Sequence, residues 1–380
     1  MKIDVTPVRT DSDLDQFLRL PWELYRHDAN WIPPLLSSEK KLLDQKNNPF
    51  WIHSEGEYFL ARRGEKVVGR IAAIVNGMHN QIHEEKTGFF GFYECESDPD
   101  TAHLLLSTAE EWVRSRGMTT MRGPANPSMN DTAGMLVDGF KWPPFVMMTY
   151  NPRYYPGQLE SAGYTKAMDL LAYLLLQTEV VRKKIDRVAG HIQERKNIQI
   201  RTVNLRRFEE ELRLVMDIYN NAWERNWGFV PMTDEEISFV AHDMKSIILP
   251  EWTYFAEYQG ETVGFSLALP DINTALRKCN GKLFPFGWYH FLRFNLRKIP
   301  TIRVVALGVK KEVQHLGIGT LFYKRYFDEG YKRKYRAAEM SWILENNDVM
   351  NRPLRMMGGQ PYKTYRMYEK KIAKETQGEP

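Results

Sequence analysis

The clearest change of hydrophobic period in the chain lies just after residue 309. The largely apolar run Val304–Val309 predicts a buried strand. Apolar side chains then recur at helical spacing from Ile318 to Tyr326, and Gly317 and Gly319 stand where the period changes. The pattern predicts a strand, a glycine turn and a helix whose first backbone N–H groups can bind a phosphate. An ordinary loop turn is the alternative explanation of a glycine pair alone.

A weak internal repeat organises the rest of the chain. The strand, glycine turn and strand of residues 57–70 recur at residues 253–265. The later expected elements are strands 89–94 and 118–122 around a helix from Ala102 to near Gly117, strands 304–309 and 337–344 around a helix from 318 to about 333, and final strands 170–176 and 362–368. The repeat predicts two copies of one α/β unit, with a chance match of common elements as the alternative.

The repeat also predicts the domain boundaries. A chain of 380 residues exceeds what a single core usually supports. We expect a first domain at 1–178, a polar and partly helical linker at 179–198, and a second domain at 199–380.

Composition excludes several classes of protein. The net charge of +4 is too small to indicate nucleic acid, and no nucleic-acid motif accompanies it. The N-terminus lacks a signal-peptide core, and the longest apolar run, Leu170–Leu176, is too short to span a bilayer. Cys95 and Cys279 form no metal-ligand spacing and no disulfide framework. We expect a cytoplasmic protein without a metal, nucleic acid or integral membrane association, and its oligomeric state stays open.

The stretch after the strand at 304–309 carries a family resemblance. Gln314, Gly317 and Gly319 form a Gln-x-x-Gly-x-Gly pattern at a helix start. No Gly-Lys-Ser or Gly-Lys-Thr follows, and the first glycine of a dinucleotide fingerprint is missing. The pattern resembles the acetyl-coenzyme A loop of the GCN5-related N-acetyltransferase (GNAT) superfamily. The resemblance implies an α/β protein with two GNAT domains, each a mixed, mostly antiparallel sheet flanked by helices.

The resemblance further implies that the second half binds acetyl-CoA or another acyl-CoA. Its strand would pair with the pantetheine arm, a main-chain N–H near Val309 would bind the thioester oxygen, and the loop would hold the pyrophosphate. Lys310, Lys311 and Lys324 are candidates for the remaining phosphate charge, or solvated surface residues. The expected cofactor-binding residues are Leu307, Gly308, Val309, Gln314, His315, Leu316, Gly317, Ile318, Gly319, Thr320 and Asn347.

The end of the next strand carries the expected catalytic group. Glu345 is the candidate general base for an attacking amine. Asn347 stands eleven residues before Gly358, as an Asn does in the superfamily, although a helix cap is an equal alternative. The superfamily's acidic Tyr is replaced by Leu354, which leaves the general acid open. The possible substitutes are Tyr362, Tyr365 and Tyr368.

The first half resembles a degenerate copy. Where its loop should lie, residues 94–100 carry four acids, which would repel a polyanion. Its proline-rich loops can still serve the acceptor or form structural turns. The expected acceptor-binding residues are Asn126, Asn130 and, in the second half, Trp342.

A basic, aromatic stretch separates the second hairpin from the motif strand. Residues 272–311 contain nine cations and no acid, interleaved with aromatic residues. A packed helix with a solvated basic face is one interpretation, and a rim that attracts an anionic ligand is another. The aromatic members are Phe284, Phe286, Trp288, Tyr289, Phe291 and Phe294.

Together these patterns favour an N-acetyltransferase that moves an acetyl group from acetyl-CoA to an amine of a small-molecule acceptor. The missing Tyr leaves a non-catalytic CoA-binding or regulatory protein as an alternative. The basic aromatic stretch leaves an aminoacyl or long-chain acyl transferase of the same superfamily.

Overall fold

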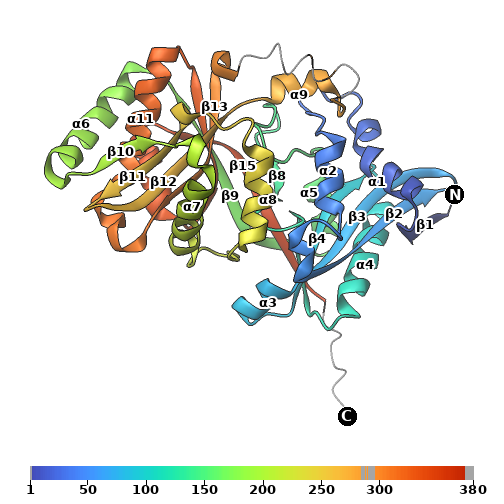
Figure 1. The fold of residues 1–380 in the computed structure, drawn as a ribbon. Coiled ribbons are helices and arrows are strands. Elements are labelled where there is room, and N and C mark those ends of the chain that lie inside the picture. The colour runs from blue at the N-terminus through green and yellow to red at the C-terminus, as the bar shows by residue number, and fades with distance from the viewer. Residues whose placement is uncertain (1, 284–286, 288, 290–295, 373–380) are drawn as a thin grey trace. The chain divides into compact units, whose positions relative to one another are not determined.

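The computed structural model describes residues 2–283, 287, 289 and 296–372, which form two compact units (Figure 1). The first unit contains the chain up to Asp169, residues 280–283 and the chain from Thr364 onward. The second unit contains Leu170–Cys279 and the described residues from 287 to 363.

The first unit is built on a mixed, mostly antiparallel sheet. Its elements are β1 (Ile3–Pro7), α1 (Asp11–Leu24), α2 (Leu36–Leu43), η1 (Pro49–Ile52), β2 (Ser54–Arg63), β3 (Lys66–Asn76), α3 (Gly77–His83), β4 (Thr87–Cys95), α4 (Pro99–Arg114), β5 (Thr120–Gly123), β6 (Ala125–Asn126), β7 (Thr132–Ala133), β8 (Met135–Asp138), α5 (Tyr155–Ser161) and the start of β9 (Thr165–Leu176). The sheet runs β1-β2-β3-β4-β5-β15, β8 also pairs with β15, and only the β4–β5 pair is parallel.

The second unit repeats this design. Its elements are α6 (Glu179–Lys196), β10 (Gln199–Thr202), η2 (Leu205–Arg207), α7 (Phe208–Trp223), α8 (Asp234–Met244), η3 (Pro250–Trp252), β11 (Thr253–Tyr258), β12 (Glu261–Pro270), α9 (Asn273–Cys279), η4 (Leu296–Lys298), β13 (Thr301–Val309), η5 (Lys311–Leu316), α11 (Ile318–Arg333), β14 (Ala337–Leu344), α12 (Asp348–Met356) and the start of β15 (Gln360–Lys371). The sheet runs β9-β14-β13-β12-β11-β10 with only β13–β14 parallel, so the predicted fold class is confirmed.

Helices cover both faces of the second unit's sheet. On one face, α6 and α11 pack together and bury a core that contains Ile185, Phe322 and Met340 (Figure 1). On the other face, α7 buries Ile218 against Phe255 and Phe265 of the β11–β12 hairpin. The side chain of a strand residue therefore enters one core or the other according to its alternation along the strand.

Residues 179–196 form a regular helix in the stretch expected as a partly helical linker. Val181, Ile185, Ala189 and Ile192 recur every three or four residues and face the core. Thr178 caps the start of α6 by accepting a hydrogen bond from the N–H of Val181.

The sheet of each unit includes part of the final strand of the other sequence half. In the first unit, residues 368–371 of β15 pair with β5. In the second unit, residues 170–176 of β9 pair with β14. The last strand of each sequence half therefore lies partly in the other compact unit.

Candidate functional site

Strands β13 and β14 pair over only part of their length. The ladder joins residues 301–304 to residues 337–340, although β13 continues to Val309 and β14 to Leu344. Val304 and Met340 form the last pair of this ladder. Beyond this pair the two strands no longer pair with each other in the ladder. We call the region between residues 305–309 of β13 and residues 341–344 of β14 the β13–β14 opening. Its closed end is at Val304 and Met340, and its open end is at Val309 and Leu344.

Both strands carry an irregularity at the closed end of this opening. On β13, Val304 and Ala306 pair with neighbouring residues of β12, so Val305 is an extra residue. On β14, the register against β9 shifts between Met340 and Ile343, which places Trp342 in the irregular stretch. Bulges of this kind bend a strand and re-aim its side chains.

The free edge of β13 presents main-chain groups toward the opening. The N–H of Lys310 donates to the carbonyl of Val263 on β12 at 2.8 Å. Because pairing groups alternate along an antiparallel strand, Gly308 also faces β12, while Leu307 and Val309 face the opening. The Gln314 amide donates to the Val309 carbonyl at 3.0 Å, in agreement with this direction.

The predicted phosphate loop lies at the end of this strand. Gly317 has φ +76°, which ends η5 and starts α11 at Ile318. Leu316 and Ile318 are buried in the core, whereas Gln314 and His315 are exposed. The buried side chains of Leu316 and Ile318 therefore anchor this turn in the core.

Gly308 and Gly319 have different local reasons to lack a side chain. A Cβ at Gly308 would come within 2.9 Å of the Trp223 ring, so this glycine lets α7 pack on β13. A Cβ at Gly319 would have Leu307 as its nearest neighbour at 3.7 Å, which leaves room in front of the helix start. The N–H of Thr320 already donates to the Gly317 carbonyl at 3.0 Å.

The three lysines expected to help with phosphate are engaged with acids. Lys310 pairs with Asp217 at 2.6 Å, and Lys311 pairs with Glu224. These exposed or half-buried pairs are worth little energy and exchange partners at small cost. Lys324 is held at 2.8 Å by Asp186 and at 3.0 Å by Asp328.

The carboxyl end of β14 carries the remaining predicted residues. Glu345 is exposed directly after the strand. Asn347 accepts a hydrogen bond from the N–H of Met350 at 3.2 Å and caps α12, as the capping alternative predicts. Leu354 is fully buried in the core, so its position carries packing.

The three substitute tyrosines have different environments. Tyr365 and Tyr368 belong to the first unit, with exposures of 0% and 1%. Tyr362 belongs to the second unit and is half-buried. Its hydroxyl donates a hydrogen bond to a carboxylate oxygen of Glu339.

Sequence reasoning missed a buried polar network at the closed end of the opening. Arg303 donates from Nε to the Ser341 hydroxyl at 2.8 Å and from Nη2 to the Ser341 carbonyl at 3.0 Å. The Ser341 hydroxyl donates to Glu339 at 2.5 Å. Burial lowers the pKa of the neighbouring Lys363 to about 8, against the opposing attraction of Glu339. The available signal was polar residues at alternate positions of otherwise apolar strands.

The first unit fills its own equivalent opening. The β4–β5 ladder ends at Phe89 and Arg122, and β6 then lies against β4. The Asn126 side chain accepts a hydrogen bond from the Phe92 N–H at 2.5 Å. A Cβ at Gly91 would collide with the Ala125 carbonyl. Asn126 thus holds this inserted segment, residues 125–133, against β4.

Glu94, Glu96 and Asp98, three of the four acids at residues 94–100, have local partners. Glu94 accepts hydrogen bonds from Tyr25 and Tyr155 at 2.8 and 2.7 Å, and burial raises its pKa. Glu96 and Asp98 pair with Arg63 at 2.6 and 2.7 Å. The N–H of Asn130, the other residue expected to bind the acceptor, donates to the Ser128 hydroxyl at 3.1 Å.

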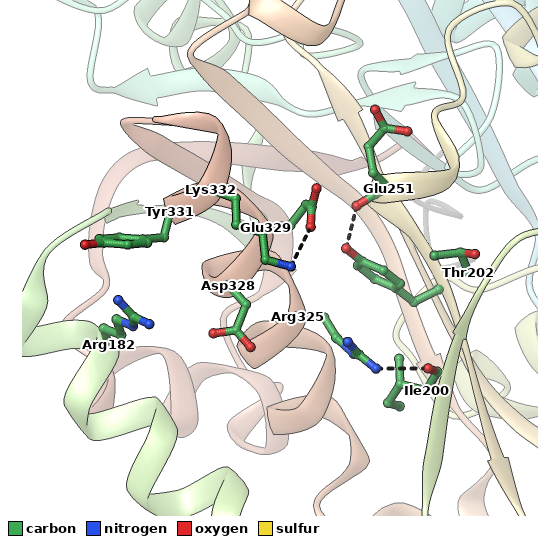
Figure 2. A pocket seen from close by; sticks show the side chains of 10 residues that line it. Arg182, Ile200, Thr202, Glu251, Arg325, Asp328, Glu329, Tyr331 and Lys332 are labelled. Carbon is green, nitrogen blue, oxygen red and sulfur yellow. Dashed lines mark hydrogen bonds and ion pairs between the residues drawn. The ribbon is translucent and has the colours of Figure 1, made fainter.

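A separate surface pocket lies at the far end of α11 (Figure 2). It encloses about 330 Å³ and is lined by Arg182, Ile200, Thr202, Glu251, Tyr254, Arg325, Asp328, Glu329, Tyr331 and Lys332. Its three cations are matched by three carboxylates, and Arg182 lies 4.3 Å from the Tyr331 ring centroid. This pocket shares no lining residue with the β13–β14 opening or its loop.

Some expectations fall outside what the structure covers. Phe284, Phe286, Trp288, Phe291, Arg293 and Phe294 lie outside the described residues. Among residues 2–283 and 296–372, no group of three or more His, Cys, Asp or Glu side chains could hold a metal ion. In the same part of the chain, every helix is too short or too polar to cross a membrane.

Solved structures share this two-unit architecture. A tandem GNAT protein from the clavulanic acid biosynthesis pathway superposes with a TM-score of 0.57 at 12% identity, covering 98% of this chain and 99% of that chain. A GCN5-related N-acetyltransferase from Sphaerobacter thermophilus gives a TM-score of 0.52 at 14% identity, covering 97% and 96%. At these identities the likeness is one of fold.

Curated relatives are similar along almost the whole chain, although no family model matches it. Protein YghO of Escherichia coli (strain K12) is 37% identical over 371 residues, which cover 95% of this chain and 93% of that protein. The bacterial ceramide synthase of Caulobacter vibrioides (strain NA1000 / CB15N) is 36% identical over 380 residues, which cover 97% and 98%. The chain therefore has the fold of tandem GNAT proteins and belongs to the family that contains Protein YghO and the bacterial ceramide synthase.

Proposed function

We propose that the protein is an acyl-CoA-dependent N-acyltransferase that forms an amide in its second unit. The observation that carries the proposal is the β13–β14 opening, whose free strand edge leads to a glycine turn and a helix start. A pantetheine arm has amides that can pair with such an edge, and a pyrophosphate suits the backbone N–H groups of a helix start.

The donor would lie along β13. Its amides would pair with the main-chain groups of Leu307 and Val309, and its pyrophosphate would meet the N–H groups of Ile318 and Gly319. Lys310 and Lys311 would exchange their carboxylate partners for phosphate. The thioester would reach the bulge at the closed end of the opening.

The reaction would be direct transfer between two bound reactants. The nitrogen of a neutral amine attacks the thioester carbon, and a main-chain N–H of β13 stabilises the charge that develops on oxygen. An amine enters mostly as an ammonium ion at neutral pH, so one proton must leave first. Glu345, exposed beside the open end, is proposed to accept that proton directly or through water. Trp342 is proposed to contact the acceptor.

The similarity to the bacterial ceramide synthase favours a long acyl chain over the acetyl group that the loop motif alone suggests. A ceramide is an amide of a fatty acid with a sphingoid base, a long-chain amino alcohol. The 36% identity to the bacterial ceramide synthase extends over 98% of that protein. We therefore propose a fatty acyl-CoA as donor and a sphingoid-type amine as acceptor, with acetyl transfer to a small amine as the second candidate.

Both cysteines are buried free thiols, which supports the proposed cytoplasmic compartment.

The test is turnover by the purified protein with acyl-CoAs from acetyl to palmitoyl and amines that include sphinganine. We expect free CoA thiol and the matching amide, detected by mass spectrometry, with palmitoyl-CoA and sphinganine as the best pair. Tight acyl-CoA binding without thiol release would favour the non-catalytic alternative. The best rate with acetyl-CoA and a small amine would favour the second candidate.

A further inference from the structure

The buried network at the closed end of the opening lies on one face of the sheet. Val304 and Met340 point into the core that α6 and α11 cover. Arg303, Glu339 and Ser341 are their neighbours along the strands, so their side chains occupy the opposite face. All three are at most 5% exposed.

Glu339 is the centre of this network. Its carboxylate has no exposed surface, accepts hydrogen bonds from Ser341 and Tyr362, and lies 3.9 Å from the Arg303 guanidinium. A buried carboxylate costs several kcal/mol unless it is paired and hydrogen-bonded in this way. Packing alone would be served as well by apolar residues of similar volume. Ionisable groups retained at such a cost concentrate at functional sites.

The network stands where the proposed chemistry takes place. Glu339 is the ladder partner of Arg303, one pair before the ladder ends at Val304 and Met340. Ser341 is the first β14 residue beyond that ladder. Under the proposed function the thioester arrives at this closed end, next to the Val305 bulge.

Tyr362 is the least buried member of the network. It is half-buried, whereas Glu339 and Lys363 have exposures of 0% and 1%. The position that should carry an acidic Tyr is Leu354, which is enclosed by the core. A phenol backed by a buried carboxylate can accept one proton while passing on its own.

We infer that Tyr362 and Glu339 form a proton relay that carries the second amine proton to the leaving thiolate. The inference rests on the proposed function and adds residues to its site. Glu345 would accept the first proton, from the ammonium form of the acceptor, at the open end of the opening. Tyr362 and Glu339 would transfer the second proton at the closed end.

The amine lone pair forms the C–N bond, and the carbonyl π pair moves to oxygen. The ammonium-type nitrogen of the intermediate gives a proton to the Tyr362 oxygen, while the Tyr362 proton moves to Glu339. The carbonyl then re-forms, the C–S bond breaks, and the proton returns through Tyr362 to sulfur. The products are an amide and free CoA thiol, and the relay regains its first state.

The experiment compares Tyr362→Phe and Glu339→Gln with a matched control, Tyr331→Phe. Tyr331 is 56% exposed in the separate pocket on α11, so its change leaves the opening untouched (Figure 2). We expect both relay variants to lose kcat by roughly 10²- to 10⁴-fold while binding a thioether analogue of acyl-CoA as the wild type does. We expect the pH dependence of kcat to lose the limb that reports the relay.

Hydroxylamine as acceptor separates the relay from Glu345, because it is uncharged at neutral pH and needs no first deprotonation. Glu345→Gln should regain most of its rate with hydroxylamine, whereas Tyr362→Phe should not. Near wild-type kcat and an unchanged pH profile for both relay variants would overturn the relay. Loss of analogue binding in both would assign the network a structural role and also overturn the relay. A wild type that binds acyl-CoA without turnover would instead overturn the proposed function and the relay with it.

Discussion

At the scale of residues, a few buried polar side chains connect β13 and β14 in the second unit's sheet. The Arg303 guanidinium donates hydrogen bonds to the hydroxyl and the carbonyl of Ser341. These side-chain hydrogen bonds connect β13 to β14 at the point where the backbone ladder ends. Local periodicity predicts both strands, because the residues that flank Arg303 and Glu339 are apolar. It does not predict the network, since the partners of a buried charge come from distant segments of the chain.

Lys363 should make stability depend on pH. Burial lowers its pKa from 10.5 to about 8, with Glu339 and Asp271 acting in the opposite direction. Between pH 8 and 10.5 the unfolded chain therefore binds more protons, and the free energy of unfolding rises with pH. Lys363→Met should be more stable than the wild type at pH 7, by up to about 3 kcal/mol, and this gain should shrink toward pH 10. Urea unfolding at pH 7 and pH 10 measures the difference in free energy of unfolding between the variant and the wild type. An equal difference at both pH values would contradict the lowered pKa of Lys363.

Leu354 should matter for packing alone. It has no exposed surface, so Leu354→Ala should lower the free energy of unfolding by about 2–5 kcal/mol. Met356 on the same helix is 63% exposed, and Met356→Ala should change it by less than about 0.5 kcal/mol. Chemical denaturation compares the two. Similar small effects would show that Leu354 is not enclosed as described.

At the scale of elements, the two units differ in what occupies the space beyond their parallel strand pair. In the first unit, residues 125–133 enter that space and Asn126 bonds to β4. In the second, the strand leads to the glycine turn at Gly317. The strand at 337–344 has the predicted bounds, and the helix starts at the predicted residue 318 and ends close to the predicted position, because both have strong local periods. The inserted segment has no such period and was expected only as a loop.

Close packing of the inserted segment predicts an asymmetric response to Gly→Ala changes. Gly91→Ala would place a Cβ against the Ala125 carbonyl, and a backbone atom cannot easily move away. We expect a loss of about 1–3 kcal/mol in the free energy of unfolding, with acyl-CoA binding unchanged. The control is Gly157→Ala in α5, which meets nothing within 4 Å and should be neutral or slightly stabilising. A Gly91→Ala protein as stable as the control would contradict the packing of this segment.

At the scale of the whole molecule, the boundaries of the two compact units differ from the boundaries of the two sequence halves. The first unit includes residues from Thr364 onward, and the second begins at Leu170. The repeat predicts two α/β copies, which the fold confirms, but a final strand has the same local pattern whichever sheet it joins. The exchange of these strands was therefore beyond the reach of periodicity.

The exchanged strand predicts that the halves do not fold separately. A chain that ends at residue 178 lacks residues 364–371, which pair with β5 and β8. It would expose the edge of β5 and part of the first unit's core, so we expect aggregation or loss of cooperative thermal unfolding. Co-expression with residues 179–380 should restore a soluble complex. Cooperative unfolding of residues 1–178 alone would contradict the exchange.

The central claim is that the β13–β14 opening of the second unit binds one acyl-CoA, and titration calorimetry with a thioether analogue of palmitoyl-CoA tests it most directly. We predict one site per chain, loss of binding in Gly319→Trp, whose new side chain would fill the space before α11, and normal binding in the control Gly157→Trp. Absence of binding to the wild type, or unchanged binding to Gly319→Trp, would contradict the claim.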